Sequence, residues 1–294
     1  MTLAGPAIGA DRVIALSPHL AELACAAGGC DKLVGAVAWS DYPERVKALP
    51  QVGDAYAVNI EQVLSLQPDL VLAWEGGTPR ETQERLQALK LRVERVSIRG
   101  LDEVADGLRR VGALLGTPGS AEMAAQRYVA RLARLRARHQ GVAPKLRVYY
   151  QIELEPAYSI NADSPISQAI ELCGGINVFA DLPILAATVN REAVLARDPQ
   201  VLLYSRQDDG DAIRAYWKRA GLSATRAGAF YEIDGSLLDR ATPRLLDGVE
   251  QVCAALSDAR AALLGKKGPS TGAPRHPSPA PAPAPPRKDS RTGG

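Results

Sequence analysis

The sequence contains few of the residues on which catalysis and metal binding usually depend. Histidine occurs three times in 294 residues, and aromatic residues make up 5% of the chain. There is no G-x-x-x-x-G-K-[ST] phosphate loop, and no G-x-G-x-x-G motif follows the first predicted strand. His19 alone among the histidines follows a strand, where α/β proteins place ligand sites, although a capping or surface role fits it better. These absences favour a binding protein over an enzyme.

Absent features also limit the possible locations and metal sites. No run of 18 apolar residues could span a bilayer, and the first ten residues lack the basic start and sustained apolar stretch of a signal peptide. The four cysteines, Cys25, Cys30, Cys173 and Cys253, lack the paired C-x-x-C and histidine spacing of a structural zinc site. We therefore expect no metal site. The residues alone leave open whether the cysteines are bridged and where the protein resides.

The charge of the chain is concentrated at its C-terminus. The formal net charge is +2, but segment 266–294 holds six lysines and arginines against one aspartate, so the rest is mildly acidic. The same segment contains eight prolines in 29 residues, a composition that cannot bury a core. We expect a disordered basic tail over 266–294. A mildly acidic body without a basic stripe predicts no nucleic-acid partner.

One segment of the chain occurs twice. Residues 59–72 and 190–203 share six of fourteen positions at a constant offset of 131. Each copy has an Asn before a helix, a Glu in the first turn (Glu61 and Glu192), an apolar helix face, and then a Pro and a buried strand. A repeat at this distance predicts two similar halves and not a solenoid. Each acid by itself also has a simpler explanation, because a first-turn Glu interacts favourably with the helix dipole.

Strands and helices alternate through both halves, which predicts an α/β fold of two similar three-layer lobes with mainly parallel sheets. Strands are expected at 12–16, 33–38, 70–74, 93–98, 146–150, 201–204 and 229–233. Residues 120–140 lack Pro and Gly and space apolar residues three and four apart, which predicts one long rigid helix between the lobes. The expected domains are an extension over 1–10, a lobe over 11–118, a linking helix over 119–141, a lobe over 142–265 and the tail.

Several of the few aromatic residues fall at strand ends and in the loops that follow them. These residues are Trp39, Tyr42, Tyr56, Trp74, Tyr158 and Phe179. Trp and Tyr in such loops offer a stiff, amphipathic surface suited to a flat apolar ligand, although partial burial would explain any one of them. Asp239 and Arg240 are placed to add polar contacts to the same rim. Together these residues predict a ligand site between the two halves.

A set of motifs resembles the helical-backbone periplasmic binding proteins over about residues 11–263. The motifs are Arg12-Val-Ile-Ala-Leu-Ser-Pro with Glu22-Leu23, Ser40-Asp-Tyr-Pro43, Asn59-x-Glu61, Gln67-Pro-Asp-Leu-Val-Leu-Ala-Trp74-x-Gly-Gly77 and Leu172-Cys-Gly-Gly-x-Asn177. The resemblance is closest to the cobalamin-binding members. It implies a monomeric, non-enzymatic, periplasmic protein that captures cobalamin or a related corrinoid between its lobes, as cargo and not as a cofactor, and delivers it to an ABC importer permease.

The resemblance also implies roles for particular residues. Trp39, Trp74 and the segment Ser236, Leu237, Leu238, Asp239 and Arg240 correspond to cleft residues, Glu61 and Glu192 to the acids that dock onto permease arginines, and Cys173 and Cys253 to a disulfide. Leu237, Leu238 and Ala186 stand where the cobalamin binders are aromatic, and Cys25 and Cys30 have no counterpart. The aliphatic residues keep haem and ferric siderophores open as ligands. An intracellular tetrapyrrole-metal enzyme or chaperone is the alternative from another class.

Overall fold

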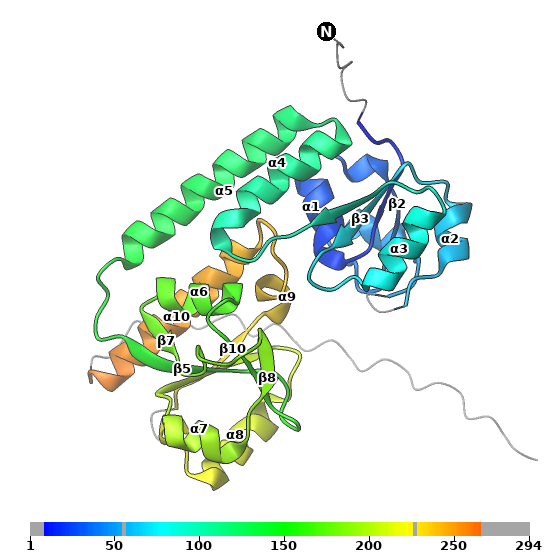
Figure 1. Cartoon of the computed structure of the whole chain (residues 1–294). Helices are drawn as coiled ribbons and strands as arrows, with labels where there is room; N and C mark the ends of the chain where they lie inside the picture. Colours follow the sequence, from blue (N-terminus) through cyan, green and yellow to red (C-terminus); the bar gives the residue numbers. More distant parts are fainter. Residues whose placement is uncertain (1–8, 55–56, 226–227, 266–294) are drawn as a thin grey trace, which may run out of the picture.

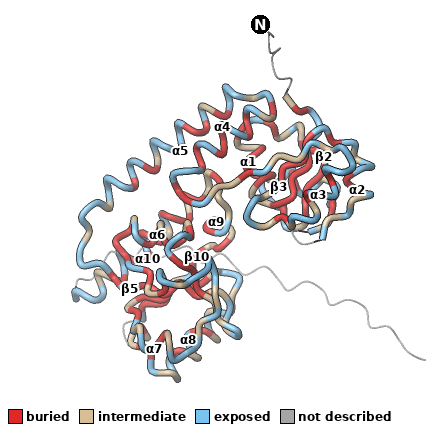
Figure 2. Tube along the Cα trace, in the orientation of Figure 1, coloured by how far each residue is buried: buried red, intermediate tan, exposed pale blue. Residues whose placement is uncertain are grey.

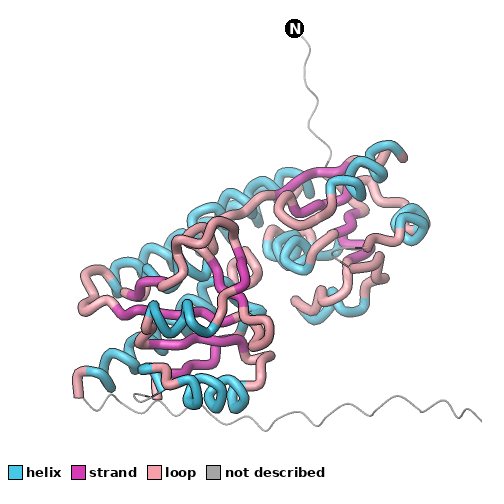
Figure 3. Tube along the Cα trace, turned by 60° about the horizontal axis from the view of Figure 1, so that its bottom comes forward, coloured by secondary structure: helices cyan, strands magenta, loops and turns pink. Residues whose placement is uncertain are grey.

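The computed structural model describes residues 9–54, 57–225 and 228–265, and Figure 1 shows two lobes joined by a long helix. Tyr56 and the tail expected over 266–294 lie outside the described residues. Within the described ranges, every helix is too short or too polar to cross a membrane. With the bottom of the molecule turned forward, the strands of each lobe form a layer flanked by helices (Figure 3).

The N-terminal lobe (N-lobe) is built on a parallel sheet in the order β2-β1-β3-β4. Successive residues of β1 contact opposite layers, since Val13 and Ala15 pack with helices α1 and α4 while Ile14 packs with α2 and α3. The elements are β1 (Val13–Ala15), α1 (Pro18–Ala26), β2 (Leu33–Ala36), α2 (Ile60–Ser65), β3 (Leu70–Trp74), α3 (Arg80–Ala88), β4 (Val93–Val96) and α4 (Val104–Leu115), with short 3-10 turns at Cys30–Lys32, Glu44–Ala48 and Leu101–Glu103.

The C-terminal lobe (C-lobe) has a parallel sheet in the order β10-β9-β5-β7. Its elements are β5 (Leu146–Gln151), β6 (Tyr158–Ile160), α6 (Pro165–Leu172), β7 (Gly175–Asn177), β8 (Ala186–Thr188), α7 (Arg191–Arg197), β9 (Val201–Ser205), α8 (Gly210–Ala220), a turn at Ser223–Thr225, β10 (Phe230–Ile233), α9 (Gly235–Leu238) and α10 (Leu245–Leu263). If the four strands of each sheet are numbered in chain order, both sheets have the order 2-1-3-4. The prediction of two similar α/β lobes is confirmed.

The long helix α5 (Pro118–His139) links the lobes along one side of the molecule (Figure 1). It packs closely on α4, because a Cβ added at Gly112 would lie 2.1 Å from the Cβ of Ala121. In the C-terminal half of α5, Arg131 pairs with Asp247 at 2.6 Å and with Glu250 at 2.9 Å, both on α10. Buried and exposed residues alternate along α5 (Figure 2), as expected of a helix that packs on one face.

Both copies of the sequence repeat form the same helix and strand. The side chains of Asn59 and Asn190 accept hydrogen bonds from backbone amides three residues on, at 3.0 and 2.8 Å, and so cap α2 and α7. Each lobe also has an arginine that the repeat did not include. Arg12 donates to the Leu66 carbonyl at 2.6 Å, and Arg147 donates to the Asp198 carbonyl at 2.7 Å. Each arginine thus ties the start of a central strand to the end of the repeated helix.

The elements that sequence patterns missed are short. Strands β6, β7 and β8 have three residues each, and α9 has four. A three-residue strand gives too few positions for an alternating pattern to be recognised. The antiparallel pair β6-β8 is an addition of the C-lobe that has no equivalent in the described part of the N-lobe.

Candidate ligand-binding cleft

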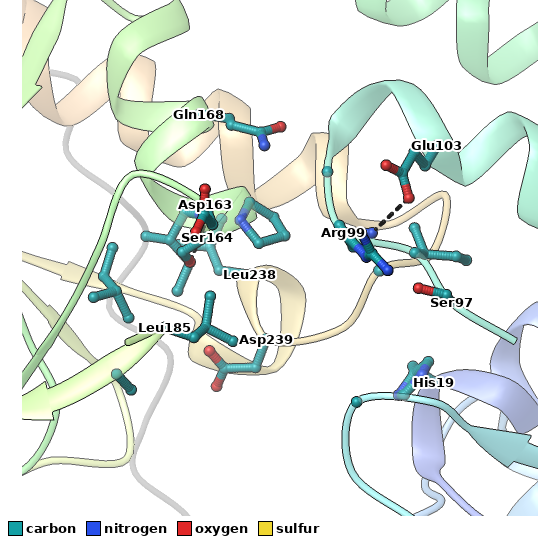
Figure 4. A pocket seen from close by; sticks show the side chains of 18 of the residues that line it. His19, Ser97, Arg99, Glu103, Asp163, Ser164, Gln168, Leu185, Leu238 and Asp239 are labelled. Carbon is teal, nitrogen blue, oxygen red and sulfur yellow. Dashed lines mark hydrogen bonds between the residues drawn. The ribbon is translucent and has the colours of Figure 1, made fainter. Parts of the chain in front are cut away.

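A cavity of about 840 Å³ lies between the lobes and is large enough for a bulky small molecule. Both sheets point the carboxyl ends of their strands toward it: Trp74 ends β3, Ile152 follows β5, and Leu238 follows β10. Ligands of open α/β sheets bind at this edge. In Figure 4, His19, Ser97, Arg99 and Glu103 form the N-lobe wall, and Asp163, Ser164, Leu185, Leu238 and Asp239 form the C-lobe wall.

Trp74 is the aromatic residue of the N-lobe wall, and its neighbours fix the position of its indole ring. A Cβ added at Gly77 would lie 2.0 Å from Cε3 of the indole, so the loop after β3 closes tightly over the ring. The imidazole of His19 also makes an edge contact with the indole, with 5.2 Å between ring centroids and an interplanar angle of 88°. The side chain is therefore held ready for a ligand without a rotamer change.

His19 lies at the start of α1, and its ring enters the cleft (Figure 4). The Ser17 hydroxyl lies 2.8 Å from Nδ1 and 3.3 Å from Nε2. Burial, together with the positive charge of Arg240, lowers the pKa of His19 to about 4. The imidazole is consequently neutral at physiological pH. The sequence favoured a capping or surface role, whereas in the structure the half-buried side chain is among the residues that line the cleft.

The C-lobe wall is mostly aliphatic. It is formed by Ile152, Ile160, Ile166, Leu185, Ala186 and Leu238, and no described aromatic residue of this lobe is among the lining residues. Asp239 adds a carboxyl group that is accessible from the cleft but surrounded by protein atoms, and this confinement raises its pKa to about 6. Gln168 also lines the cleft, and its side chain accepts a hydrogen bond from the Leu101 amide at 2.9 Å, which joins the lobes.

A second contact between the lobes is a set of polar residues that we call the inter-lobe cluster: Glu22, Asp41, Arg240, Thr242 and Arg244. Thr242 donates to the buried carboxylate of Glu22 at 2.6 Å, and Arg244 pairs with the same carboxylate at 3.3 Å. Arg240 pairs with Asp41 and lies 3.8 Å from Glu22. Burial, with a smaller contribution from the charge of Asp41, raises the pKa of Glu22 against the opposing effects of the Thr242 hydrogen bond and the two arginines.

Three predicted cleft residues lie at this cluster and not among the residues that line the cavity. Trp39 is 81% exposed, has a φ of 66°, and accepts a hydrogen bond through its carbonyl from Arg240 at 3.1 Å. The ring of Tyr42 lies 3.9 Å from the guanidinium carbon of Arg244. Arg240 itself is occupied by its N-lobe partners. Trp39, Tyr42 and Arg240 are thus at the lobe junction beside the cleft.

Other predictions differ more from the structure. Phe179 is 1% exposed and packs edge-on against Tyr149 in the C-lobe core, so its placement in the cleft is wrong. Leu237 is buried and is not among the residues that line the cavity, and the Ser236 hydroxyl donates to Asp234 as part of the α9 cap. Tyr158 is half-buried on β6, two residues before the cleft residue Ile160. Leu238 and Asp239, in contrast, line the cavity as expected.

The two acids of the repeat lie at equivalent places outside the cavity. Glu61 and Glu192 are exposed in the first turns of α2 and α7, at the same edge of the two sheets as the cleft. The two acids differ in the residue that precedes them. Arg191 precedes Glu192 and pairs with it at 3.1 Å, whereas the apolar Ile60 precedes Glu61.

All four cysteines are bridged. Cys173–Cys253 joins the end of α6 to α10, as the resemblance implied. Cys25–Cys30, whose state the sequence left open, closes the end of α1. Among the described residues, no group of three or more histidines, cysteines or acids is placed to hold a metal ion.

Comparison with known proteins agrees with this architecture. The family model for periplasmic binding proteins matches residues 13–237, which is more than half of the chain. The chain belongs to the periplasmic binding protein family. Its members bind substrates, and the cleft between the two lobes is the candidate substrate site in this chain.

Individual relatives of this periplasmic binding protein are known. It is 36% identical over 253 residues to a vitamin B12-binding protein of Vibrio cholerae, which covers 85% of this chain and 91% of the relative. The crystal structure of the periplasmic vitamin B12-binding protein of Vibrio cholerae superimposes with a TM-score of 0.79 at 34% identity, covering 86% and 99% of the two chains. The periplasmic haem-binding protein of Roseiflexus sp. RS-1 gives 0.77 at 26% identity, covering 85% and 99%.

Proposed function

We propose that this protein captures cobalamin or a related corrinoid in its inter-lobe cleft and delivers it to the permease of an ABC importer. The observation that carries the proposal is the cavity between the lobes, with the fixed indole of Trp74 on one wall and aliphatic side chains on the other. A corrin ring is broad and mainly apolar on its faces, and it carries amide side chains at its edge. The likeness to vitamin B12-binding proteins supports this ligand.

Titration with cyanocobalamin, followed by intrinsic tryptophan fluorescence, tests the ligand. We expect saturable quenching at micromolar or lower concentration, with most of the change lost in Trp74→Phe. The buried Trp217 of the C-lobe core should contribute little, so Trp217→Phe is the matched control. Absence of binding at micromolar cyanocobalamin would refute the corrinoid assignment.

Haem is the second candidate, because haem-binding proteins are among the structural relatives. A neutral imidazole, such as that of His19 in the cleft wall, is able to coordinate haem iron. Haemin titrated in the same way would bind more tightly than cyanocobalamin if this candidate were correct, with a Soret shift that His19→Ala removes.

We further propose that Glu61 and Glu192 dock onto basic residues of the permease. Their exposure, their equivalent positions and the absence of either from the cavity lining support an outward role. In reconstituted transporter, Glu61→Arg with Glu192→Arg should abolish stimulation of ATPase activity and leave ligand affinity unchanged. Glu81→Arg is a matched control, since Glu81 is an exposed first-turn acid on α3. A loss of ligand affinity in the double variant would assign these acids to the binding site instead.

Residence in the periplasm completes the proposal. Family membership and two disulfide bonds support it, because disulfides persist in oxidising compartments. Fractionation of cells that express the native gene, followed by thiol labelling of the isolated protein, tests both points together. Recovery in the cytoplasm with free thiols would favour the intracellular alternative.

A further inference from the structure

The charges that line the cleft are predominantly negative. Five carboxyl groups take part in the lining: Glu75, Asp102, Glu103, Asp163 and Asp239. Among the described lining residues, Arg99 supplies the single guanidinium, and the imidazole of His19 is neutral because its pKa is about 4. The acids lie on both walls, with Glu103 on the N-lobe side and Asp163 and Asp239 on the C-lobe side (Figure 4).

Other arginines near the cleft are engaged with protein carboxylates. Arg136 makes two contacts with Asp102, at 2.7 and 2.8 Å, which neutralises that acid. Arg240 and Arg244 belong to the inter-lobe cluster and pair with Asp41 and Glu22. A ligand with carboxylates at its edge would therefore find few cations to meet them. It would instead approach Asp163 and Asp239 on the aliphatic wall.

We infer that the cleft selects its macrocycle by peripheral charge: it accepts rings whose edges carry neutral amides and rejects rings whose edges carry carboxylates. This inference rests on the proposed function and names the property that separates corrinoids from haem and from anionic iron chelates. Asp163 and Asp239 are the specificity-determining residues. Amides donate hydrogen bonds to carboxylates, whereas a ligand carboxylate meets like charge in a site partly shielded from water.

Coulomb's law sets the size of the effect. Two like charges about 8 Å apart cost a factor of about 2 in affinity in fully hydrated surroundings and about 30 at the effective dielectric constant of a protein surface. Two acids on one wall therefore predict that one added ligand carboxylate weakens binding about tenfold or more. Because the cleft is open to solvent, the penalty should shrink as salt is added.

The test compares ligands that differ by one charge. Cyanocobalamin and its monocarboxylic acids, in which a single propionamide is hydrolysed, have the same ring and nearly the same shape. We expect the monocarboxylic acids to bind the wild-type protein at least about tenfold more weakly at low salt. The readout is the ratio of the two dissociation constants. A substitution that changes the affinity for both ligands equally leaves this ratio unchanged.

In Asp163→Asn with Asp239→Asn, this ratio should fall toward 1 and haemin binding should increase. Asp31→Asn is the control, because Asp31 is an exposed acid on the 3-10 turn after α1, outside the cleft, and it should leave the ratio unchanged. The inference is overturned if the wild-type protein binds amide and carboxylate equally, or if the double variant keeps the wild-type ratio. If cyanocobalamin itself does not bind, the proposed function fails, which is a different result from equal binding of the two ligands.

Discussion

Removing the carboxylate of Glu22 should loosen the junction between the lobes. Glu22 is 3% exposed on α1 of the N-lobe, and its partners Thr242 and Arg244 belong to the segment before α10. In Glu22→Ala, the fully buried Thr242 hydroxyl and the Arg244 guanidinium both lose their acceptor. In Glu22→Gln, the side-chain oxygen can still accept from Thr242. The two variants therefore separate the hydrogen bond from the charge.

The contacts give the size of each effect. Breaking a buried ion pair costs about 3–5 kcal/mol when the remaining charge is left uncompensated. Arg244 keeps its stacking on Tyr42 and some access to water, so we expect about 2–3 kcal/mol for Glu22→Ala. Glu22→Gln should cost about 1 kcal/mol or less, because burial already penalises the ionised acid, as its raised pKa shows.

Urea unfolding across pH tests these values. A raised pKa means that Glu22 favours the folded state at acid pH, below the pKa of an unfolded Glu, and that this contribution is lost as pH rises through the folded pKa. The stability of Glu22→Gln relative to wild type should therefore improve from acid to neutral pH. Equal destabilisation by both variants, or a loss below about 0.5 kcal/mol in Glu22→Ala, would refute the reasoning.

Three further predictions concern the cleft wall and the disulfide. The pKa of His19 is lowered to about 4, so its contribution to stability is present above about pH 6.5 and is lost as pH falls toward 4. His19→Asn should remove this acid sensitivity, which is measured as the unfolding free energy against pH. Gly77→Ala should displace the Trp74 indole and weaken ligand binding roughly tenfold, or about 1.4 kcal/mol, whereas Gly119→Ala, with no atom within 4 Å of the added Cβ, should not. Replacing Cys173 and Cys253 by Ser opens a loop of 80 residues and should lower the unfolding free energy by about 2–4 kcal/mol, and unchanged urea midpoints would contradict this.

Sequence patterns predicted the parts of this protein that local chemistry determines. The Asn caps, the apolar strands and the proline after each repeated helix lie within a few residues of one another, so the two lobes and the long helix could be recognised. Phe179 was misplaced because a loop aromatic has the same local signature whether it faces a cleft or a core, and packing on Tyr149 decides between them. The cleft position of His19 has no local signal, because the ring that it contacts, Trp74, and the charge that acts on it, Arg240, are distant in sequence.

The inter-lobe cluster was missed for a related reason. Glu22 belongs to one of the family-like motifs, and the sequence predicts a ligand contact for Arg240. Their interaction spans more than 200 residues of sequence, and no periodic pattern or local spacing encodes it. A lone Glu in the middle of the apolar helix α1 is a usable signal, since burial of an acid requires a partner. The identity of that partner could come from the tertiary structure alone.

The arrangement of the contacts between lobes bears on how a ligand is exchanged. The lobes are joined by α5, by Gln168 with the Leu101 amide, and by the inter-lobe cluster. The Gln168 contact lies beside α5, because the Tyr128 hydroxyl of α5 donates to the Leu101 carbonyl at 2.8 Å, whereas the inter-lobe cluster joins α1 to the segment before α10. A change in the angle between the lobes must therefore disturb at least one of these contacts. We therefore expect little closure when a ligand binds, and scattering curves with and without cyanocobalamin should nearly coincide. In Glu22→Ala one connection is lost, and a ligand-dependent change in the scattering curve should emerge. A large closure in the wild-type protein would show that these contacts do not restrain the lobes. If they do restrain the lobes, release of the ligand requires the permease to break them.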